Sequence, residues 1–258
     1  MKDVTKTRDN NIVLDRVETY DAQNLDCYPF RRGTDEIEGR SLAIGNMVSG
    51  FPFEIEGVVF QNSEAAYIAG MFSDGSEKHN ALQEECRLNT NGFLSKKTIR
   101  RFNEDIKRPD WETYNIQWML YVVWCKVATN KQFRDILMRI PMTATIIEDS
   151  TFQSGPTATI WGTRNQSLKQ SSNDRRKVLS QSMCKAAVNR QLDHERLTIW
   201  RKQGQFIGKN FMGKILMLCQ NAVANNTVPP IDVELLKTKN IQFFGKVLTF
   251  DNIPVCKQ

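Results

Sequence analysis

Apolar positions along the chain recur mostly with the 3.6-residue period of an amphipathic helix, and less often with the two-residue period of a strand. The clearest helical pattern covers residues 112–128, where positions 116, 119, 120, 123 and 127 are apolar, and it predicts the central helix of the fold. The same spacing predicts a helix over 132–140, ended by Pro141, and another after Gly208. Further helices are predicted at 62–72, 77–87, 95–104 and 232–237, with one inside 164–205 that carries Leu179, Met183 and Ala186 on one side.

Strand-like patterns are short and few. Residues 52–60, PFEIEGVVF, place two β-favouring runs around Glu56 and Gly57, where glycine supplies the positive φ of a tight hairpin turn. ATIIE at 144–148, TATIW at 157–161 and IQFFGKVLTF at 241–250 are also predicted as strands. The pattern therefore predicts an α+β fold that is predominantly α-helical, with small β elements.

Most of the chain is expected to form one elaborated domain, because 258 residues with 40% hydrophobic composition can bury a substantial core. We place this domain at 41–226. Residues 1–40 are polar apart from Ile12-Val13-Leu14, which predicts a loosely packed arm with one strand. Residues 227–258 are expected to form an extension packed on the domain.

Composition argues against a membrane span, a metal site and a disulfide framework. No stretch reaches the roughly 18 to 20 uninterrupted apolar residues of a membrane-spanning helix. The start MKDVTKTRDNN lacks the apolar segment of a signal peptide, so a cytoplasmic location is expected. The six cysteines form no CxxC pair, and His79 and His194 are far apart in sequence. We therefore expect reduced thiols, no structural metal and no cofactor.

The net charge of +6 is concentrated in one segment. Residues 164–205 contain ten Lys or Arg and three acids, a net +7, which leaves the rest of the chain near −1. Such a segment would attract phosphates and bind DNA or RNA with a steep salt dependence. The alternative is a solvated helix face with no ligand.

Four short segments stand in a fixed order, and each is weak evidence when taken alone. They are NSEAAYIAGMF (62–72), RPDW (108–111), IWG (160–162) and GKNFMGKILM (208–217). With their context, their order resembles the pattern of the NADAR (YbiA-like) family over most of residues 41–224. The matching positions are Asn46, Pro52-Phe53, Gly57, Ser63-Glu64, Asp110-Trp111, Lys126, Glu148, Trp161-Gly162, Asn210, Gly213 and Leu216-Met217.

The resemblance implies a YbiA-like fold and an N-glycosidase that removes ADP-ribose from a guanine base of a nucleotide or nucleic acid. It also implies functional pairing with an ADP-ribosyltransferase toxin. One alternative within the family is hydrolysis of ribosylamino-pyrimidine intermediates of riboflavin biosynthesis. Another is a module that binds ADP-ribose or nucleic acid without turnover.

Two acids fit the family pattern as catalytic residues. Glu64 ranks first because it begins a helix directly after a hairpin, a rigid junction that can aim a side chain. Its structural alternative is a helix-start Glu that the macrodipole favours by about 0.3 to 1 kcal/mol. Glu148 ends an apolar strand and ranks second, with exposure at an edge as the alternative. Either carboxylate would stabilise positive charge on the ribose or deprotonate the attacking water.

The remaining pattern positions are expected to bind substrate. Trp111 and Trp161 would stack on an aromatic ring, with core packing as the alternative, whereas Trp118 and Trp124 are assigned to the core. Lys126 would bind phosphate or instead extend to solvent. The full set of substrate-binding candidates is Asn46, Trp111, Lys126, Trp161, Gly162, Lys209, Asn210 and Gly213.

The segment GKNFMG would offer free backbone amides to a phosphate at a helix start; its glycines would otherwise permit close packing, and Asn210 would cap the helix. Asn46 would contact a ribose hydroxyl or base edge, with a turn role as the alternative. The chain departs from the family in lacking the His, Gln and Lys after Glu64 and an acid after Gly162. Arg164 or Lys209 is a candidate to replace a lost phosphate contact.

Overall fold

The computed structural model describes residues 12–256, which fall into two compact units. Unit 1 contains residues 12–45 and 138–217, and unit 2 contains residues 46–137 and 218–256. Far more of the described residues lie in helices than in strands, so the predicted α+β, predominantly helical class is confirmed. The predicted single domain over 41–226 stays a prediction, because two compact units can belong to one domain.

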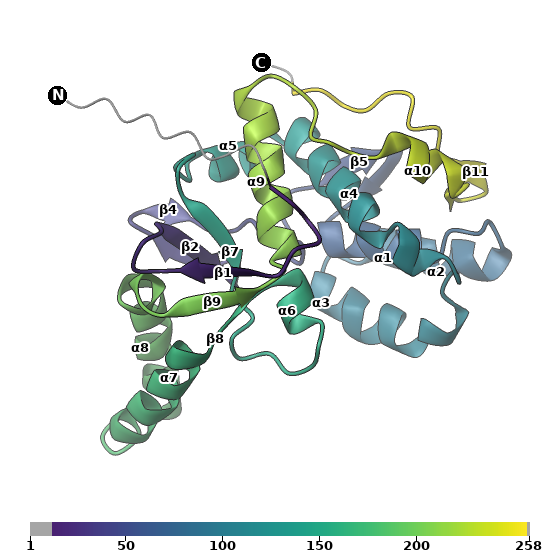
Figure 1. The fold of residues 1–258 in the computed structure, drawn as a ribbon. Helices are drawn as coiled ribbons and strands as arrows, with labels where there is room; N and C mark the ends of the chain where they lie inside the picture. Colours follow the sequence, from purple (N-terminus) through teal and green to yellow (C-terminus); the bar gives the residue numbers. More distant parts are fainter. Residues whose placement is uncertain (1–11, 257–258) are drawn as a thin grey trace. The chain divides into compact units, whose positions relative to one another are not determined.

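Unit 1 is built on short strands that pair residues far apart in the chain. The strands are β1 (Glu18–Asp21), β2 (Cys27–Phe30), β3 (Glu36–Ile37), β4 (Arg40–Ser41), β7 (Thr145–Glu148), β8 (Arg164–Asn165) and β9 (Gln205–Gly208). β9 lies between β1 and β8 and pairs antiparallel with both (Figure 1). β2 pairs in parallel with β7, and β3 pairs antiparallel with β4.

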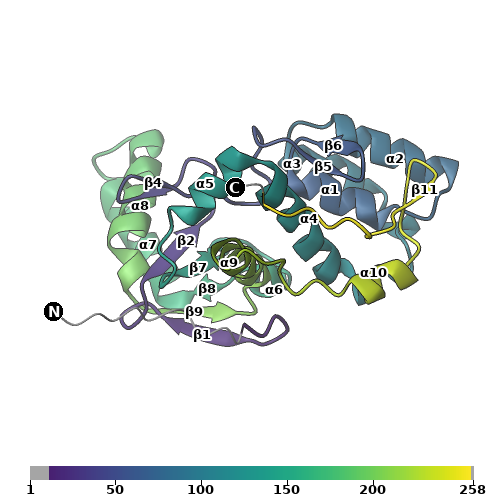
Figure 2. The ribbon, with the colours of Figure 1, turned by 90° about the horizontal axis from the view of Figure 1, so that it is seen from above.

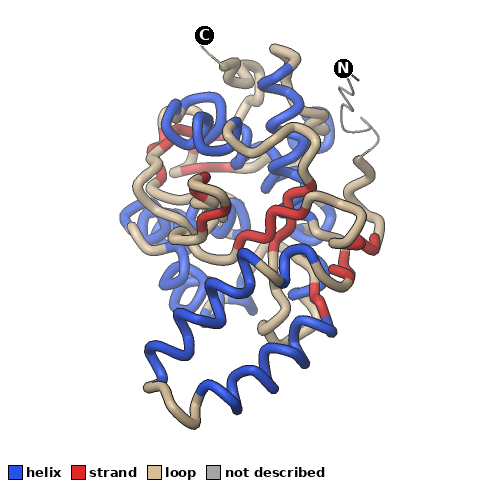
Figure 3. Tube along the Cα trace, turned by 90° about the vertical axis from the view of Figure 1, so that its left-hand side faces the viewer, coloured by secondary structure: helices blue, strands red, loops and turns tan. Residues whose placement is uncertain are grey.

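The helices of unit 1 follow β7. They are α6 (Ala158–Trp161), α7 (Gln166–Leu179), α8 (Lys185–Thr198), a 3-10 turn (Trp200–Lys202) and α9 (Phe211–Ala224), whose residues up to Met217 belong to this unit. α7 and α8 run side by side as a helical hairpin (Figure 3). Leu168 and Leu179 of α7 and Val188 and Leu192 of α8 are buried in one apolar cluster with Phe206 of β9.

Three sequence predictions are wrong in unit 1. Residues 18–41 are not a loose arm with one strand, because β1 to β4 lie there and Tyr20 and Phe30 are buried. Residues 157–161 form no strand; α6 occupies them, because Pro156 opens a turn and the Trp161 amide bonds the Thr157 carbonyl at 3.0 Å. The basic segment contains two helices, and Ala186 is exposed.

Unit 2 is mainly helical. Its helices are α1 (Ser63–Met71), α2 (Glu77–Leu88), α3 (Gly92–Leu94), which continues as a π-helical stretch (Ser95–Arg100), α4 (Asn115–Thr129), α5 (Lys131–Met138) and α10 (Val233–Thr238), with 3-10 turns at Glu104–Ile106 and Trp111–Thr113. Its strands are β5 (Phe53–Ile55), β6 (Val58–Phe60), β10 (Gln242–Phe243) and β11 (Lys246–Val247). Figure 2 shows the β5–β6 hairpin beside α1.

The turn residues and a helix cap explain how the β5–β6 hairpin leads into α1. Glu56 and Gly57 have φ values of 42° and 91°, and two successive positive φ angles are the signature of a type I′ hairpin turn. Asn62 then caps α1, because its side-chain oxygen accepts the Ala65 amide at 2.9 Å. The predicted hairpin and capped helix are therefore confirmed.

Aromatic side chains fill the core of unit 2. Trp118 and Trp124 are fully buried, as predicted. The Trp118 ring meets Phe243 edge-on at 5.5 Å between centroids, and Trp124 Nε1 donates to the Pro254 carbonyl at 2.8 Å. The predicted single strand at 241–250 is wrong: Phe244 and Gly245 have positive φ and reverse the chain between β10 and β11.

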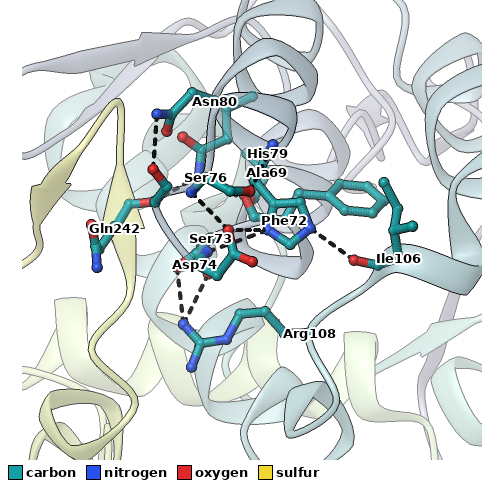
Figure 4. A network of polar contacts seen from close by, with 12 residues as sticks. Ala69, Phe72, Ser73, Asp74, Ser76, His79, Asn80, Ile106, Arg108 and Gln242 are labelled. Carbon is teal, nitrogen blue, oxygen red and sulfur yellow. Dashed lines mark hydrogen bonds and ion pairs between the residues drawn. The ribbon is translucent and has the colours of Figure 1, made fainter.

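A polar network around the buried His79 ring joins the end of α1 to the start of α2 (Figure 4). The His79 ring lies between two oxygens, with Nδ1 2.7 Å from Asp74 Oδ1 and Nε2 2.7 Å from the Ile106 carbonyl. Arg108 donates to the Ser73 carbonyl at 2.9 Å. These contacts fix the loop that follows the α1 helix.

Candidate functional site

Asn46 and Glu64 lie in direct contact in unit 2. The Glu64 amide donates to the Asn46 carbonyl at 3.0 Å, and Asn46 Nδ2 donates to Glu64 Oε2. Glu64 is in the first turn of α1, immediately after the Asn62 cap, so a helix and a capped turn fix its main chain. Asn46 thereby orients the carboxyl group from one side.

Burial controls the acidity of Glu64. Glu64 is only 3% exposed. Because burial removes water from around the carboxyl group, it raises the pKa of Glu64 above its ordinary value. Lys96 and Arg100, from the helical segment after α3, act in the opposite direction through their positive charge. A carboxylate with a raised pKa is a stronger base than one in water, and a hydrogen bond that orients it suits it to accept a proton.

Trp111 is placed in the core of unit 2. Its ring is fully buried and packs against Tyr67 at 4.9 Å and Tyr114 at 5.2 Å between centroids. Its indole Nε1 is buried without a hydrogen-bond partner in the described residues. This is the core-packing arrangement, and base stacking by Trp111 stays a prediction.

Lys126 is fully buried in α4, so the expectation that it extends to solvent is wrong. Its Nζ lies 4.2 Å from the centroid of the Phe133 ring and 5.3 Å from that of Phe51, and donates to the Val48 carbonyl at 3.4 Å. No carboxylate pairs with it in residues 12–256. Burial therefore lowers the pKa of Lys126 to about 7.

Glu148 and Asn210 meet in unit 1, but through the main chain of Glu148. The Glu148 amide donates to Asn210 Oδ1 at 3.0 Å, and Asn210 Nδ2 donates to the Ile146 carbonyl at 2.9 Å. Asn210 is buried with a φ of 53°, and its side chain ties the start of α9 to β7. The side-chain role observed for Asn210 is therefore to join two elements and not to cap the helix.

The predicted glycines lie where two backbones approach closely. A Cβ on Gly213 would stand 2.3 Å from the Ile146 carbonyl oxygen, and one on Gly162 would stand 2.6 Å from that of Glu148. Gly208 is equally close to the Gly162 carbonyl, at 2.4 Å. Close packing explains all three residues.

The amides before α9 are already bonded. Lys209 N–H donates to the Thr159 carbonyl at 2.7 Å, and Asn210 N–H donates to the Gly162 carbonyl at 3.3 Å. The Lys209 ammonium pairs with Asp15. Trp161 is partly exposed and meets Phe211 edge-on at 5.7 Å. Phosphate binding at this helix start stays a prediction.

The basic segment 164–205 uses several of its charges internally. Arg201 pairs with Asp26 at 3.0 Å and Glu38 at 2.7 Å. Arg196 is buried beside Asp35 and Asp149. Arg164 donates to the Gln153 and Gly155 carbonyls, both at 2.8 Å. The surface of the segment is therefore less basic than its composition indicates.

The structure brings together Asn46 and Glu64 in unit 2, and Glu148, Gly162, Asn210 and Gly213 in unit 1. Lys96 and Arg100 were not predicted as neighbours of Glu64, because the stretch 95–104 fits no motif. Among the helices within residues 12–256, none is long and apolar enough to cross a lipid bilayer. Across the same residues, no group of three or more His, Cys, Asp or Glu could hold a metal ion.

Comparison with known proteins gives a likeness in structure but none in sequence family. The chain matches no protein-family model and no curated protein. It is similar to an NMR structure of the E. coli protein YbiA, with a TM-score of 0.46 and 20% sequence identity. The alignment covers 79% of this chain and 92% of the YbiA chain. A likeness of this degree does not assign the chain to a family.

Proposed function

We propose that the protein is an N-glycosidase that hydrolyses the bond between ADP-ribose and a guanine base, with Glu64 as its catalytic carboxylate. The observation that carries the proposal is the buried Glu64 carboxyl, hydrogen-bonded by Asn46 and with a raised pKa. The sequence motifs around it, which resemble those of NADAR proteins, supply the substrate class. Glu148 and the substrate-binding candidates of unit 1 are predictions within this proposal.

Breaking an N-glycosidic bond builds positive charge on the ribose ring as the base departs. An ionised Glu64 would stabilise this charge and deprotonate the water that attacks the ribose carbon. A raised pKa makes the carboxylate a stronger base than one in water. The Asn46 amide would act as a positioning group, because it donates to one carboxyl oxygen and leaves the other for water.

Positive charge near Glu64 fits a substrate that carries a diphosphate. Lys96 and Arg100 are the two cations whose charge acts on the Glu64 carboxyl. Lys96 is exposed, and Arg100 also lies 3.6 Å from Glu104. In the proposed enzyme they would attract the diphosphate of ADP-ribose to the same end of α1.

A substrate panel tests the proposal. Wild-type protein is incubated with guanine-ADP-ribosylated DNA, with the equivalent RNA and with a ribosylamino-pyrimidine, and free ADP-ribose or ribose phosphate is measured by mass spectrometry. Release of ADP-ribose from the guanine adducts is expected. Release from the ribosylamino-pyrimidine alone would show that this compound, and not ADP-ribosylated guanine, is the substrate. No release from any of the three compounds would contradict the proposed activity.

A further inference from the structure

Unit 1 contains a small cavity whose walls are rich in arginine. It has a volume of about 190 Å³ and lies between the residues that follow β2 and the facing sides of α7 and α8. Arg31, Arg32, Arg176 and Arg196 line it, together with Asp193. Sites for drug-sized ligands measure roughly 300 to 1,000 Å³, so this cavity suits a single small group.

Two of the four guanidinium groups are balanced by nearby carboxylates. Arg32 pairs with Asp193. Arg196 Nη2 lies 2.7 Å from Asp35 Oδ2, and its Nη1 lies 3.5 Å from Asp149 Oδ2. These contacts neutralise part of the cavity, but they do not satisfy Arg196.

Arg196 is buried in the wall of the cavity, and its guanidinium group has a hydrogen-bond donor without an acceptor. Its side chain is 2% exposed. Within the described chain its Nε has no acceptor, whereas Nη2 is occupied by the ion pair with Asp35. An unmet buried guanidinium donor is costly, and an anion in the cavity would satisfy it.

Arg31 and Arg176 carry positive charge with no carboxylate partner in residues 12–256. Arg31 lies over the Phe152 ring, 5.4 Å from its centroid, and Arg176 donates to Asn189 Oδ1 at 2.9 Å. Burial, and then the positive charges of Arg32 and Arg196, lower the pKa of Arg31, while the carboxylates of Asp149 and Asp193 oppose them only in part. A phosphate group carries −1.5 to −2 charges near pH 7 and would balance both residues.

We propose that this cavity binds a phosphate group, held by Arg31, Arg176 and Arg196. Guanidinium groups match phosphate oxygens with paired hydrogen bonds, and the cavity volume admits the phosphate but not a whole nucleotide. The proposal does not depend on the N-glycosidase activity, since none of these residues belongs to the Glu64 region.

Calorimetric titration with inorganic phosphate tests the site, at an ionic strength held constant with chloride so that general screening does not change. Wild-type protein should bind phosphate saturably. Arg31→Gln and Arg176→Gln should each weaken binding by at least about tenfold, since each removes a charge-assisted hydrogen bond. Arg190→Gln is the matched control, because Arg190 is exposed on α8 and does not line the cavity.

No saturable binding by the wild type would overturn the proposal, as would equal weakening by Arg31→Gln and Arg190→Gln. Melting temperatures establish that each variant is folded; Arg176 is exposed, so its variant keeps the test intact if Arg31→Gln does not fold. Competition by oligonucleotides with a 5′-phosphate or a 5′-hydroxyl distinguishes the source. If the oligonucleotide with a 5′-phosphate displaces inorganic phosphate, the site accepts a nucleic-acid phosphate. If neither oligonucleotide displaces it, the site binds the phosphate of a small molecule.

Discussion

Asn46 and Glu64 are joined twice, once through the main chain and once through their side chains, although 18 positions separate them. The main-chain bond fixes the distance between the two residues, and the side-chain bond fixes the direction of the carboxyl group. This pair is the centre of the proposed chemistry.

Replacing Asn46 with Ala removes the donor that orients the Glu64 carboxyl. Because a hydrogen bond to a charged group contributes about 1.5 to 3 kcal/mol, release of ADP-ribose should slow by about 10- to 100-fold. Initial rates under saturating substrate measure the change. Asn225→Ala is the control, since Asn225 is an exposed residue that directly follows α9. A rate equal to wild type would remove Asn46 from the mechanism.

Glu64 should make folding stability fall as pH rises through the acidic range. The pKa of Glu64 is raised in the folded state, so the native protein binds more protons than the unfolded chain between the two pKa values. Stability is therefore lost as pH rises from the unfolded pKa to the folded pKa. Glu64→Gln should be more stable than wild type near pH 7, with a smaller difference near pH 4. Urea unfolding at both pH values measures this; a constant difference would contradict the burial of a titrating carboxyl.

Lys126 should make folding stability rise with pH above neutrality. Its pKa falls from 10.5 to about 7 on folding, so the unfolded chain binds more protons between these values and stability rises with pH across them. Lys126→Met should therefore stabilise the protein most at or below about pH 7, with a gain that shrinks toward pH 10. Lys131→Met, at an exposed lysine on α5, is the control. A gain that grew with pH would contradict this environment.

Gly213 should not accept a methyl group. A Cβ there would stand 2.3 Å from the Ile146 carbonyl oxygen, so α9 or β7 must move. Gly213→Ala should lower the free energy of unfolding by about 1 to 3 kcal/mol, the usual cost of overpacking. Denaturant unfolding measures it, and a change within 0.5 kcal/mol of zero, expected only away from packed positions, would show that the two elements separate easily.

The helical pattern predicted α1, α4 and α9 from local spacing, although the structure buries all of α1 and residues 118–128 of α4 on every side. It missed β1 and β2, whose partners β9 and β7 are distant in the chain, since pairing of this kind leaves no local signal. The strand predicted for TATIW (157–161) was wrong for a related reason. Its β-branched residues favour a strand, but the turn at Pro156 leads the chain into helix α6.

The candidate residues were partly predictable for the same physical reason. Glu64 stands out because it closely follows a hairpin and the helix cap Asn62 in the sequence. Its contact with Asn46 and the nearby charges of Lys96 and Arg100 depend on tertiary packing. Composition also overstated the basic surface, because Arg196 and Arg201 are buried against carboxylates from the first 40 residues and from Asp149.

The central claim is that Glu64 catalyses release of ADP-ribose from guanine. The direct measurement compares wild type and Glu64→Gln on guanine-ADP-ribosylated DNA, following ADP-ribose release by mass spectrometry and substrate binding by titration. The account predicts that the variant binds the DNA nearly as well as wild type but releases ADP-ribose at least about a hundredfold more slowly. Equal release by the two proteins would contradict it.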